Sequence, residues 1–281
     1  MATTDLHFVC GALTPVHRGV RFLGGAVDDE IAVDAAGVAM RTLNHTSGTF
    51  SAWIMTPDAA GTYAFFSAGD KSAVEYMYFR IENTTIHAMC VLATPTTQFD
   101  VNTAAGTIKS HKWHHIAIVQ DGTSLKIYID GQDMPLTWTV STTRSRWFEG
   151  LDQIDTAIIG GAISVAGTDA ITEEFKGYIS DVRIWSGLTT TGALTAAQVK
   201  SVMSGSKPAS TYLHNSWDLE EDLLDDGSGA DDGTAAGDII FSAANEFACR
   251  LSFLETVPLT ADNVTIMADN GVGYAYSILA A

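Results

Sequence analysis

The stretch Trp113-His-His-Ile-Ala-Ile-Val119, with Asp121-Gly122 and then Leu125-Lys-Ile-Tyr-Ile-Asp-Gly131, decides the fold of this chain. In the last run apolar and polar side chains alternate, which is the two-residue period of a half-buried β-strand. The Asp-Gly pair between the runs supplies the positive φ angle that a tight turn needs. The sequence therefore predicts a β-hairpin over residues 113–131.

Strand patterns of the same kind occur along most of the chain. Residues 49–56 alternate large apolar with small side chains, and residues 76–81 are aromatic and β-branched. Only one helix is predicted, after Thr195, which can act as the N-cap of residues 196–203. Short strands with connections rich in Gly, Ser, Thr and Asp predict an all-β, two-sheet antiparallel sandwich. Further strands are predicted over 85–91, 156–161 and 175–185.

Five pieces of sequence in one order carry a resemblance. They are Phe50-x-x-Trp53, the 113–131 hairpin, Ile159-Gly-Gly161, Gly177-Tyr-Ile-Ser-Asp-Val-Arg-Ile-Trp185, and Leu194-Thr195 with the short helix. Together they resemble the laminin-G-like, concanavalin-A-like jelly-roll superfamily. The resemblance implies a fold and a habit of binding, and it does not imply a reaction.

The resemblance covers the chain from about Val20 to about residue 242. We therefore expect a jelly-roll domain over residues 18–242, preceded by an N-terminal arm over residues 1–17. Residues 243–281 are expected to form a C-terminal extension that contains a second hairpin. A hairpin is marginal alone, so this one is expected to pack on the domain or on another subunit.

The charge of the chain excludes several classes of partner. With 15 Lys+Arg and 33 Asp+Glu, the formal net charge is −18. Such a chain repels phosphate backbones and anionic lipids, so we expect neither nucleic-acid binding nor membrane docking. The charge is uneven, because residues 215–281 hold thirteen acidic residues and one base.

Cysteine usage and the N-terminus bear on where the protein is made. Cys10, Cys90 and Cys249 are widely spaced and odd in number, so we expect no disulfide framework and three small buried side chains. The first residues lack the basic and apolar regions of a signal peptide. Synthesis in the cytoplasm is expected, and release without a signal fits a particle that leaves the host by lysis.

Catalysis finds little support in the sequence. A retaining glycosidase needs two carboxylates about 5 to 5.5 Å apart. On one strand, acids two or four residues apart project from the same face, so such pairs are the candidates. Glu30 with Asp34 is the first candidate, and Asp218, Glu220 and Asp222 form the second. Neither matches the E-x-D-x-E arrangement of the glycosidases that share the resemblance. We therefore expect no enzyme.

Aromatic side chains in the long loop region after the hairpin are the candidate ligand-binding residues. Sugar faces stack on exposed rings, and Trp138, Trp147 and Phe148 lie away from the predicted strands. A loop tryptophan can equally pack beneath its own loop. The other tryptophans lie within motif strands and are expected in the core: Trp53, Trp113, Trp185 and Trp217.

Two acidic groups are the candidate calcium ligands, because jelly rolls of this superfamily often bind calcium at loop carboxylates. Neither reproduces a D-x-[DN]-x-[DN]-G calcium loop, and a solvated acidic loop is the favoured interpretation. The candidate residues are Asp28 and Asp29, and Asp225, Asp226, Asp231 and Asp232.

These expectations combine into a functional hypothesis. A lectin-like sandwich without a signal peptide or disulfides predicts a non-catalytic virion structural protein, a capsid decoration or fibre-like protein on the virion surface. We expect it to be a homo-oligomer that contacts other virion proteins, with association that depends on salt or divalent cations through residues 218–238. The alternative is a stand-alone carbohydrate-binding, lectin-like module, and a glycoside hydrolase of the same fold is the least favoured reading.

Overall fold

The computed structural model describes four stretches of the chain and the backbone of two short strands. The chain divides into two compact units, residues 14–246 and residues 1–13 with 247–281. The predicted arm over residues 1–17 lies outside the described residues, and so does most of the extension. The described stretches are 18–24, 29–93, 96–163 and 171–241.

The smaller unit contains the predicted C-terminal hairpin. Strand β17 (Ile266–Met267) pairs antiparallel with β18 (Gly273–Tyr274), and Ile266 lies opposite Tyr274. The rest of the pattern predicted over residues 263–279 lies outside the described residues.

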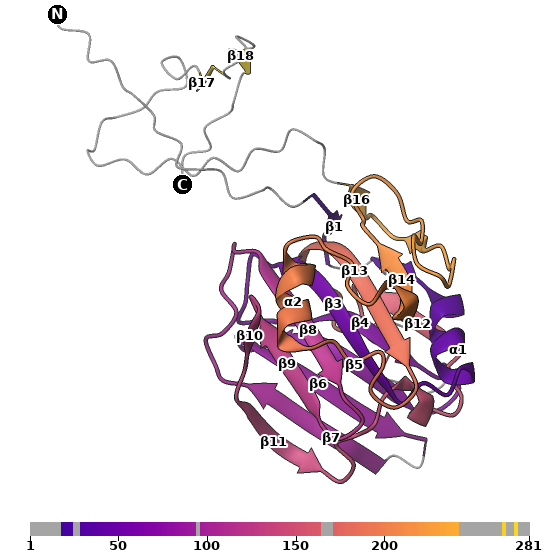
Figure 1. The fold of residues 1–281 in the computed structure, drawn as a ribbon. Helices are drawn as coiled ribbons and strands as arrows, with labels where there is room; N and C mark the ends of the chain where they lie inside the picture. Colours follow the sequence, from indigo (N-terminus) through magenta and orange to yellow (C-terminus); the bar gives the residue numbers. More distant parts are fainter. Residues whose placement is uncertain are drawn as a thin grey trace, which may run out of the picture. The chain divides into compact units, whose positions relative to one another are not determined.

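The described part of the larger unit is a sandwich of two antiparallel sheets (Figure 1). The first sheet has the order β10-β9-β8-β3-β13-β1-β16, and β14 pairs with β13 beside this path. Its strands are β1 (Val20–Phe22), β3 (Ser47–Met55), β8 (His114–Gln120), β9 (Leu125–Ile129), β10 (Gln132–Asp133), β13 (Gly177–Gly187), β14 (Leu213–Trp217) and β16 (Ile240–Phe241).

The second sheet has the order β11-β7-β6-β5-β4-β12-β2-β15. With the first sheet it forms the predicted jelly-roll sandwich. Its strands are β2 (Glu30–Ala32), β4 (Thr62–Gly69), β5 (Tyr76–Glu82), β6 (Thr85–Leu92), β7 (Thr96–Thr103), β11 (Leu136–Ser141), β12 (Thr156–Ile159) and β15 (Thr234–Ala236).

The core lies between the two sheets and is rich in phenylalanine. Phe50 of β3 contacts Phe66 of β4 and Phe79 of β5, with ring centroids 4.8 and 5.4 Å apart. All three side chains are fully buried. Burial of one such side chain stabilises the fold by about 1.5–3 kcal/mol, so this cluster is a main source of cohesion between the sheets.

The hairpin that decided the fold is confirmed in strand order and register. Ile116 of β8 lies opposite Ile129 of β9, and Gly122 in the turn has a φ of 82°. The carboxylate of Asp121 accepts hydrogen bonds from the backbone N–H groups of Thr123 and Ser124 at 2.9 and 3.1 Å. The turn therefore depends on both the glycine and the aspartate side chain.

The predicted helix, α2 (Ala196–Met203), is also confirmed. Thr195 and Gln198 form a reciprocal capping box at its N-terminus. The helix covers part of the outer face of the first sheet, in front of β8 and β9 in Figure 1. It closes a second apolar cluster made of Ala117, Val119, Tyr128, Trp185, Leu194, Val199, Val202 and Leu213.

A second helix, α1 (Asp34–Thr42), was not predicted. Its N-cap, Val33, makes no side-chain capping bond, so the usual sequence signal for a helix start is missing. Gly37 instead lets the helix approach β12 closely, because a Cβ there would lie 2.9 Å from the Cβ of Ala157. The helix also separates the first pair of candidate catalytic acids: Glu30 lies in β2 and Asp34 begins α1. That pairing on one strand is therefore wrong.

A β-bulge interrupts the predicted alternation of β13. The register against β3 shifts between Ser180 and Arg183, and Asp181 adopts a φ of 51°. Val182 and Ile184 consequently join the buried core. The side chains of Asp181 and Arg183 form an ion pair with an N–O distance of 2.6 Å. Burial raises the pKa of Asp181 despite this neighbouring positive charge.

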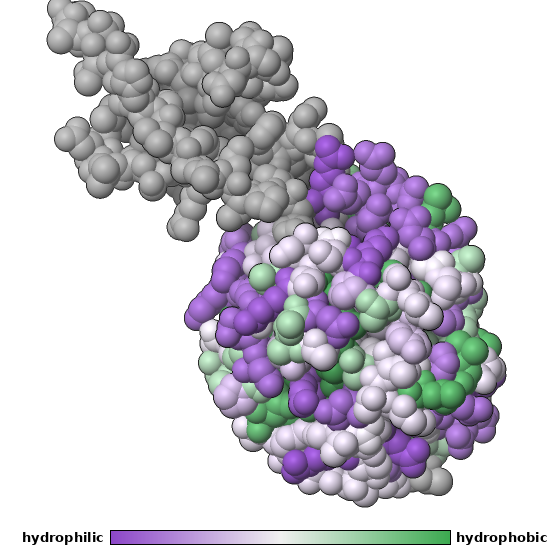
Figure 2. Space-filling view, viewed as in Figure 1, coloured by the Kyte–Doolittle hydropathy of each residue, from purple (hydrophilic) through white to green (hydrophobic). Residues whose placement is uncertain are grey.

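Hydrophilic residues gather over the segment that follows β14. Figure 2 shows them on the side of the molecule where Figure 1 draws this segment beside β14 and β16. In the described residues no helix is long and apolar enough to span a bilayer.

Candidate functional site

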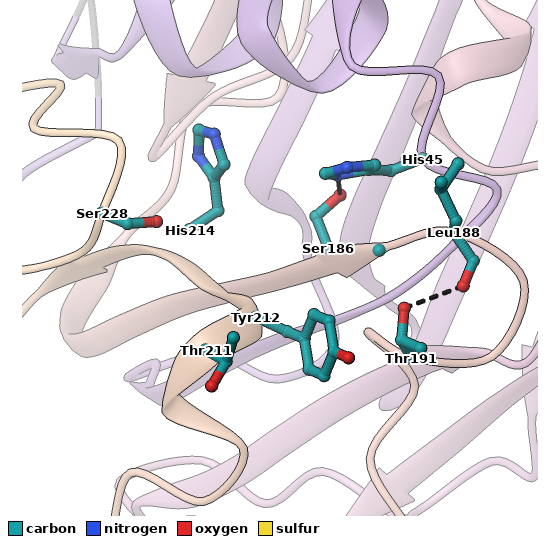
Figure 3. Close-up of a pocket in the computed structure, with 9 residues that line it drawn as sticks. His45, Ser186, Leu188, Thr191, Thr211, Tyr212, His214 and Ser228 are labelled. Carbon is teal, nitrogen blue, oxygen red and sulfur yellow. Dashed lines mark hydrogen bonds between the residues drawn. The ribbon is translucent and has the colours of Figure 1, made fainter.

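A groove at the C-terminal end of β13 is the first candidate site (Figure 3). Its volume is about 400 Å³, which lies within the usual range for small-molecule sites. We call it the histidine groove. Its walls come from the segment before β3, the end of β13 with the following loop, the start of β14, and the segment after β14. The lining residues are His45, Ser186, Gly187, Leu188, Thr191, Thr211, Tyr212, His214 and Ser228.

Tyr212 is the aromatic side chain of this groove. It ends the short 3-10 helix η2 (Ser210–Tyr212), which follows Ala209 in the left-handed conformation. The indole Nε1 of Trp185 donates a hydrogen bond of 2.8 Å to the carbonyl oxygen of Pro208 and anchors this loop on β13. Tyr212 keeps 38% of its surface exposed, so its ring can contact a ligand.

Hydroxyl groups surround the ring. Ser186 lies at the end of β13, and its Oγ is 2.9 Å from Nδ1 of His45. Thr191 donates a hydrogen bond of 2.8 Å to the carbonyl oxygen of Leu188, which folds the loop after β13 back on itself. Ser228 donates a bond of 3.1 Å to the carbonyl oxygen of Leu213. The groove thus presents hydroxyl and imidazole groups beside an aromatic ring.

The charge of His214 affects the protonation of His45. Burial lowers the pKa of His45, and repulsion from His214 lowers it further. The neutral form of His45 is therefore favoured near neutral pH, and it can both donate and accept hydrogen bonds.

The orientation of His214 is set by a chain of hydrogen bonds. The amide nitrogen of Asn215 donates to carboxylate oxygens of Asp225 at 2.7 Å and Asp231 at 3.2 Å. Carboxylates accept and do not donate, so this contact assigns the amide orientation. The amide oxygen then lies 2.7 Å from Nδ1 of His214 and accepts a hydrogen bond from it.

The candidate calcium ligands of this segment are engaged in hydrogen bonds and an ion pair. Both oxygens of Asp225 are occupied, by the backbone N–H groups of Ser216, Gly227 and Asp231 and by the Asn215 amide. Asp232 accepts the N–H of Asp225, and Asp226 pairs with Lys207 at 3.8 Å. Across the described stretches, no three His, Cys, Asp or Glu side chains meet in a way that could hold a metal ion.

Asp29, from the other candidate calcium group, is also engaged in hydrogen bonds. Asp29 is 2% exposed, and its carboxylate accepts backbone N–H groups of Leu23, Gly24 and Asp238 at 2.6 to 3.1 Å. It closes the turn after β1. Asp28 lies outside the described residues.

Two of the three predicted aromatic ligand residues are wrong. Trp147 and Phe148 are fully buried in the core, with ring centroids 4.6 Å apart. The chain after β11 turns inward through the 3-10 helix η1 (Phe148–Gly150) and places these rings between the sheets. Their polar neighbours in sequence suggested a surface loop.

Trp138 is half-buried on β11. It packs edge to face on Phe99 at 6.4 Å, and the guanidinium of Arg144 lies 4.4 Å from its ring centroid. Arg144 therefore occupies a ring face that a sugar would use. Trp185 and Trp217 are buried as predicted, whereas Trp53 and Trp113 are half-buried on the outer face of the first sheet, which corrects the core assignment for that pair.

The outer face of the second sheet carries an ion-pair network that was not predicted. Arg80 pairs with Glu82 and Glu173, and His87 lies between Glu82 and Asp100 at 2.7 and 2.8 Å. Burial alone would raise the pKa of Glu82, but the charge and hydrogen bonds of Arg80 and His87 lower it. The alternation of polar residues along β5 could have indicated this polar face. Each carboxylate is engaged by a basic side chain.

The comparisons with known proteins agree with the fold. The model of the Laminin_G_3 family, described as the concanavalin A-like lectin/glucanases superfamily, matches residues 24–200. The chain belongs to this superfamily. No curated protein matches the sequence.

Several solved structures share the fold at low sequence identity. A native heptameric SAP-like pentraxin from Limulus polyphemus has a TM-score of 0.54 at 16% identity, covering 85% of this chain and 100% of its own. The CBM40 of the Ruminococcus gnavus IT-sialidase has 0.53 at 13%, covering 66% and 96%. A putative carbohydrate binding protein from Bacteroides ovatus has 0.50 at 18%, covering 81% and 58%.

Proposed function

We propose that this protein is a carbohydrate-binding, lectin-like module that holds a saccharide in the histidine groove. The observation that carries the proposal is the exposed ring of Tyr212 beside hydroxyl and imidazole groups in one groove of about 400 Å³. A sugar offers an apolar ring face and a rim of hydroxyls, which such a groove complements.

The structural relatives support the same class of ligand. One is a CBM40 bound to α2,3-sialyllactose, with a TM-score of 0.50, and another is a putative carbohydrate binding protein. At 12% and 18% identity these relatives share the fold, so the ligand of this chain has to be measured.

The module is proposed to bind without catalysis. The carboxylates of the β5 network are paired with Arg80 and His87, and Asp34 accepts hydrogen bonds from Thr156 and from the backbone of Ala157. A glycosidase needs one carboxyl group available as an acid and a second as a nucleophile or base. Incubation with polysaccharides followed by reducing-end analysis tests this part, and cleavage that persists in a highly purified sample would overturn it.

Replacement of Tyr212 tests the groove. We expect Tyr212→Ala to weaken saccharide binding at least tenfold on a glycan array followed by calorimetry, because the stacking surface is removed. Tyr212→Phe keeps the ring and should retain most of the affinity. Leu43→Ala, another exposed apolar side chain, is the control. Unchanged binding by Tyr212→Ala would place the saccharide elsewhere.

The predicted virion role is a separate question. A lectin-like module can serve on a particle or alone. Purification of the protein from its native source, within a particle or as a free monomer, tests the virion prediction.

A further inference from the structure

A second cavity lies at the opposite end of β13 from the histidine groove. It has a volume of about 140 Å³, which is small beside typical ligand sites of about 300–1,000 Å³ and suits one charged group with its adjoining ring. At about 3.3 Å per residue, Tyr178 and Ser186 lie roughly 26 Å apart along the strand, so the two sites are separate. We call it the cationic cavity. Its lining residues are Arg21, Phe22, Leu23, Met55, Pro57, His111, Lys176, Gly177 and Tyr178.

An arginine and a tyrosine shape one wall of this cavity. Arg21 of β1 is exposed and lies opposite Tyr178 in the strand register. Its guanidinium carbon lies 5.9 Å from the centroid of the Tyr178 ring, and the Trp113 ring follows at 6.2 Å from Tyr178. A guanidinium near an aromatic ring keeps a planar set of N–H donors for a carboxylate or sulfate.

The floor of the cavity is backbone. Gly177 has a φ of 134°, and a Cβ there would collide with the carbonyl oxygen of Met55. The start of β13 therefore lies in close contact with the end of β3. Lys176 precedes this glycine and is exposed, so its ammonium group can reach a ligand.

The cavity carries positive charge, although the protein as a whole is acidic. None of its lining residues is acidic, although the chain carries a net charge of −18. Within the described stretches, neither Arg21 nor Lys176 forms an ion pair with a carboxylate. The nearby Asp29 is committed to backbone N–H groups. Among the described residues, no carboxylate therefore neutralises the positive charge of Arg21 and Lys176, and we take this charge as the ligand-binding feature of the cavity.

We propose that the cationic cavity binds the anionic group of a saccharide, with a carboxylate or sulfate on Arg21 and Lys176 and the sugar ring against Tyr178. The positive charges of Arg21 and Lys176 favour an anionic group on the ligand. The ring of Tyr178 favours a sugar that has a compact apolar face beside that group. The small volume and the strongly negative chain disfavour a polyphosphate backbone. This site goes beyond the saccharide groove proposed above and does not depend on it.

The test uses charged and neutral forms of one sugar. 3′-Sialyllactose supplies a carboxylate and 3′-sulfolactose a sulfate, and lactose is the neutral reference for both. We expect at least one charged sugar to bind the full chain tenfold more tightly than lactose, with an affinity that falls as salt is added. Arg21→Gln/Lys176→Gln should abolish that difference, and Arg21→Lys/Lys176→Arg should restore most of it.

The controls separate this site from the groove and from general charge effects. Arg41→Gln/Lys109→Gln removes two positive charges elsewhere on the surface and should leave binding unchanged. Tyr212→Ala should weaken lactose binding and retain the added affinity for the charged sugar. The proposal is overturned if neither charged sugar exceeds lactose, or if the Arg21/Lys176 double variant, with a wild-type melting temperature, binds it as the wild type does.

Discussion

The protonation of His45 should change the free energy of unfolding of the whole fold. Its pKa is lowered by burial and by His214, so at mildly acidic pH the unfolded chain binds a proton that the folded chain resists. The free energy of unfolding should therefore decrease as the pH falls below the ordinary histidine value of about 6.5.

Urea unfolding of wild type and His45→Gln between pH 5 and pH 8 checks this expectation. Glutamine can keep a hydrogen bond to Ser186 and does not titrate. The variant should lose part of the decrease seen in the wild type below about pH 6.5. Leu43→Ala, which replaces an exposed side chain and removes no titrating group, is the control and should keep the pH dependence of the wild type. Identical profiles for wild type and His45→Gln would contradict the assignment.

Whether an individual side chain is buried or exposed was the least predictable feature of this molecule. Trp147 and Phe148 sit among polar residues in sequence, and only the inward path of the chain after β11 makes them core residues. Tyr212 has no periodic pattern around it, because the 3-10 turn after Ala209 decides its exposure. A residue's neighbours in sequence do not reveal which long-range surface it meets.

At the scale of elements, the β8–β9 hairpin depends on Asp130 at its far end. The carboxylate accepts the N–H of His115 at 3.0 Å and contacts Nδ1 of His114 at 3.0 Å and the Lys112 amine at 3.3 Å. Burial alone would raise its pKa, but these hydrogen bonds and charges lower it to about 2. The stabilisation is thus present above about pH 3.8 and is lost as the pH falls towards 2.

Asp130→Asn tests this contribution. Asparagine tolerates the φ of 50° at this position, so the backbone should be preserved. We expect a loss of about 1–2 kcal/mol at pH 7, a figure reduced for solvent screening because a third of the side chain is exposed, and a smaller loss near pH 3. Denaturant titration at both pH values measures it. Asp133→Asn, on the exposed strand β10, is the control, and an equal loss at both pH values would contradict the mechanism.

The same scale shows where sequence patterns succeed. The 113–131 hairpin and the helix after Thr195 follow from local turn and capping chemistry, and both are observed. Helix α1 lacks a capping side chain, and the bulge at Asp181 shifts the alternation of β13, so neither follows from a period. These features depend on contacts with β12 and with the segment after β14, which sequence periodicity does not contain.

At the scale of the whole molecule, the order of the sequence motifs predicted the sandwich, because the strands of a jelly roll follow one another along the chain in one order. Neither candidate site was predicted. The histidine groove joins residues that are far apart in the chain, from His45 to Ser228, and the cationic cavity joins Arg21 to Lys176. Strand pairing alone brings the ends of β13 to these partners, so no local motif marks either site.

The uneven charge of the molecule leads to a prediction about self-association. The acids that remain exposed after β14 include Glu220 and Asp222, whereas the Asp225 carboxylate is occupied by hydrogen bonds. If like charge keeps copies apart, association should increase with salt, because the Debye length falls from about 30 Å at 0.01 M to about 3 Å at 1 M.

Light scattering across this salt range measures the effect. Glu220→Gln/Asp222→Asn should associate at lower salt than the wild type, and Asp152→Asn/Asp155→Asn, which removes acids from another surface, should have a smaller effect. Because the Asp225 carboxylate already has four hydrogen-bond donors, we expect calcium to act no more strongly than magnesium at equal ionic strength. A mass that stays monomeric at every salt concentration would rule out charge-gated association. A response to micromolar calcium alone would instead show that the segment after β14 rearranges to bind the ion.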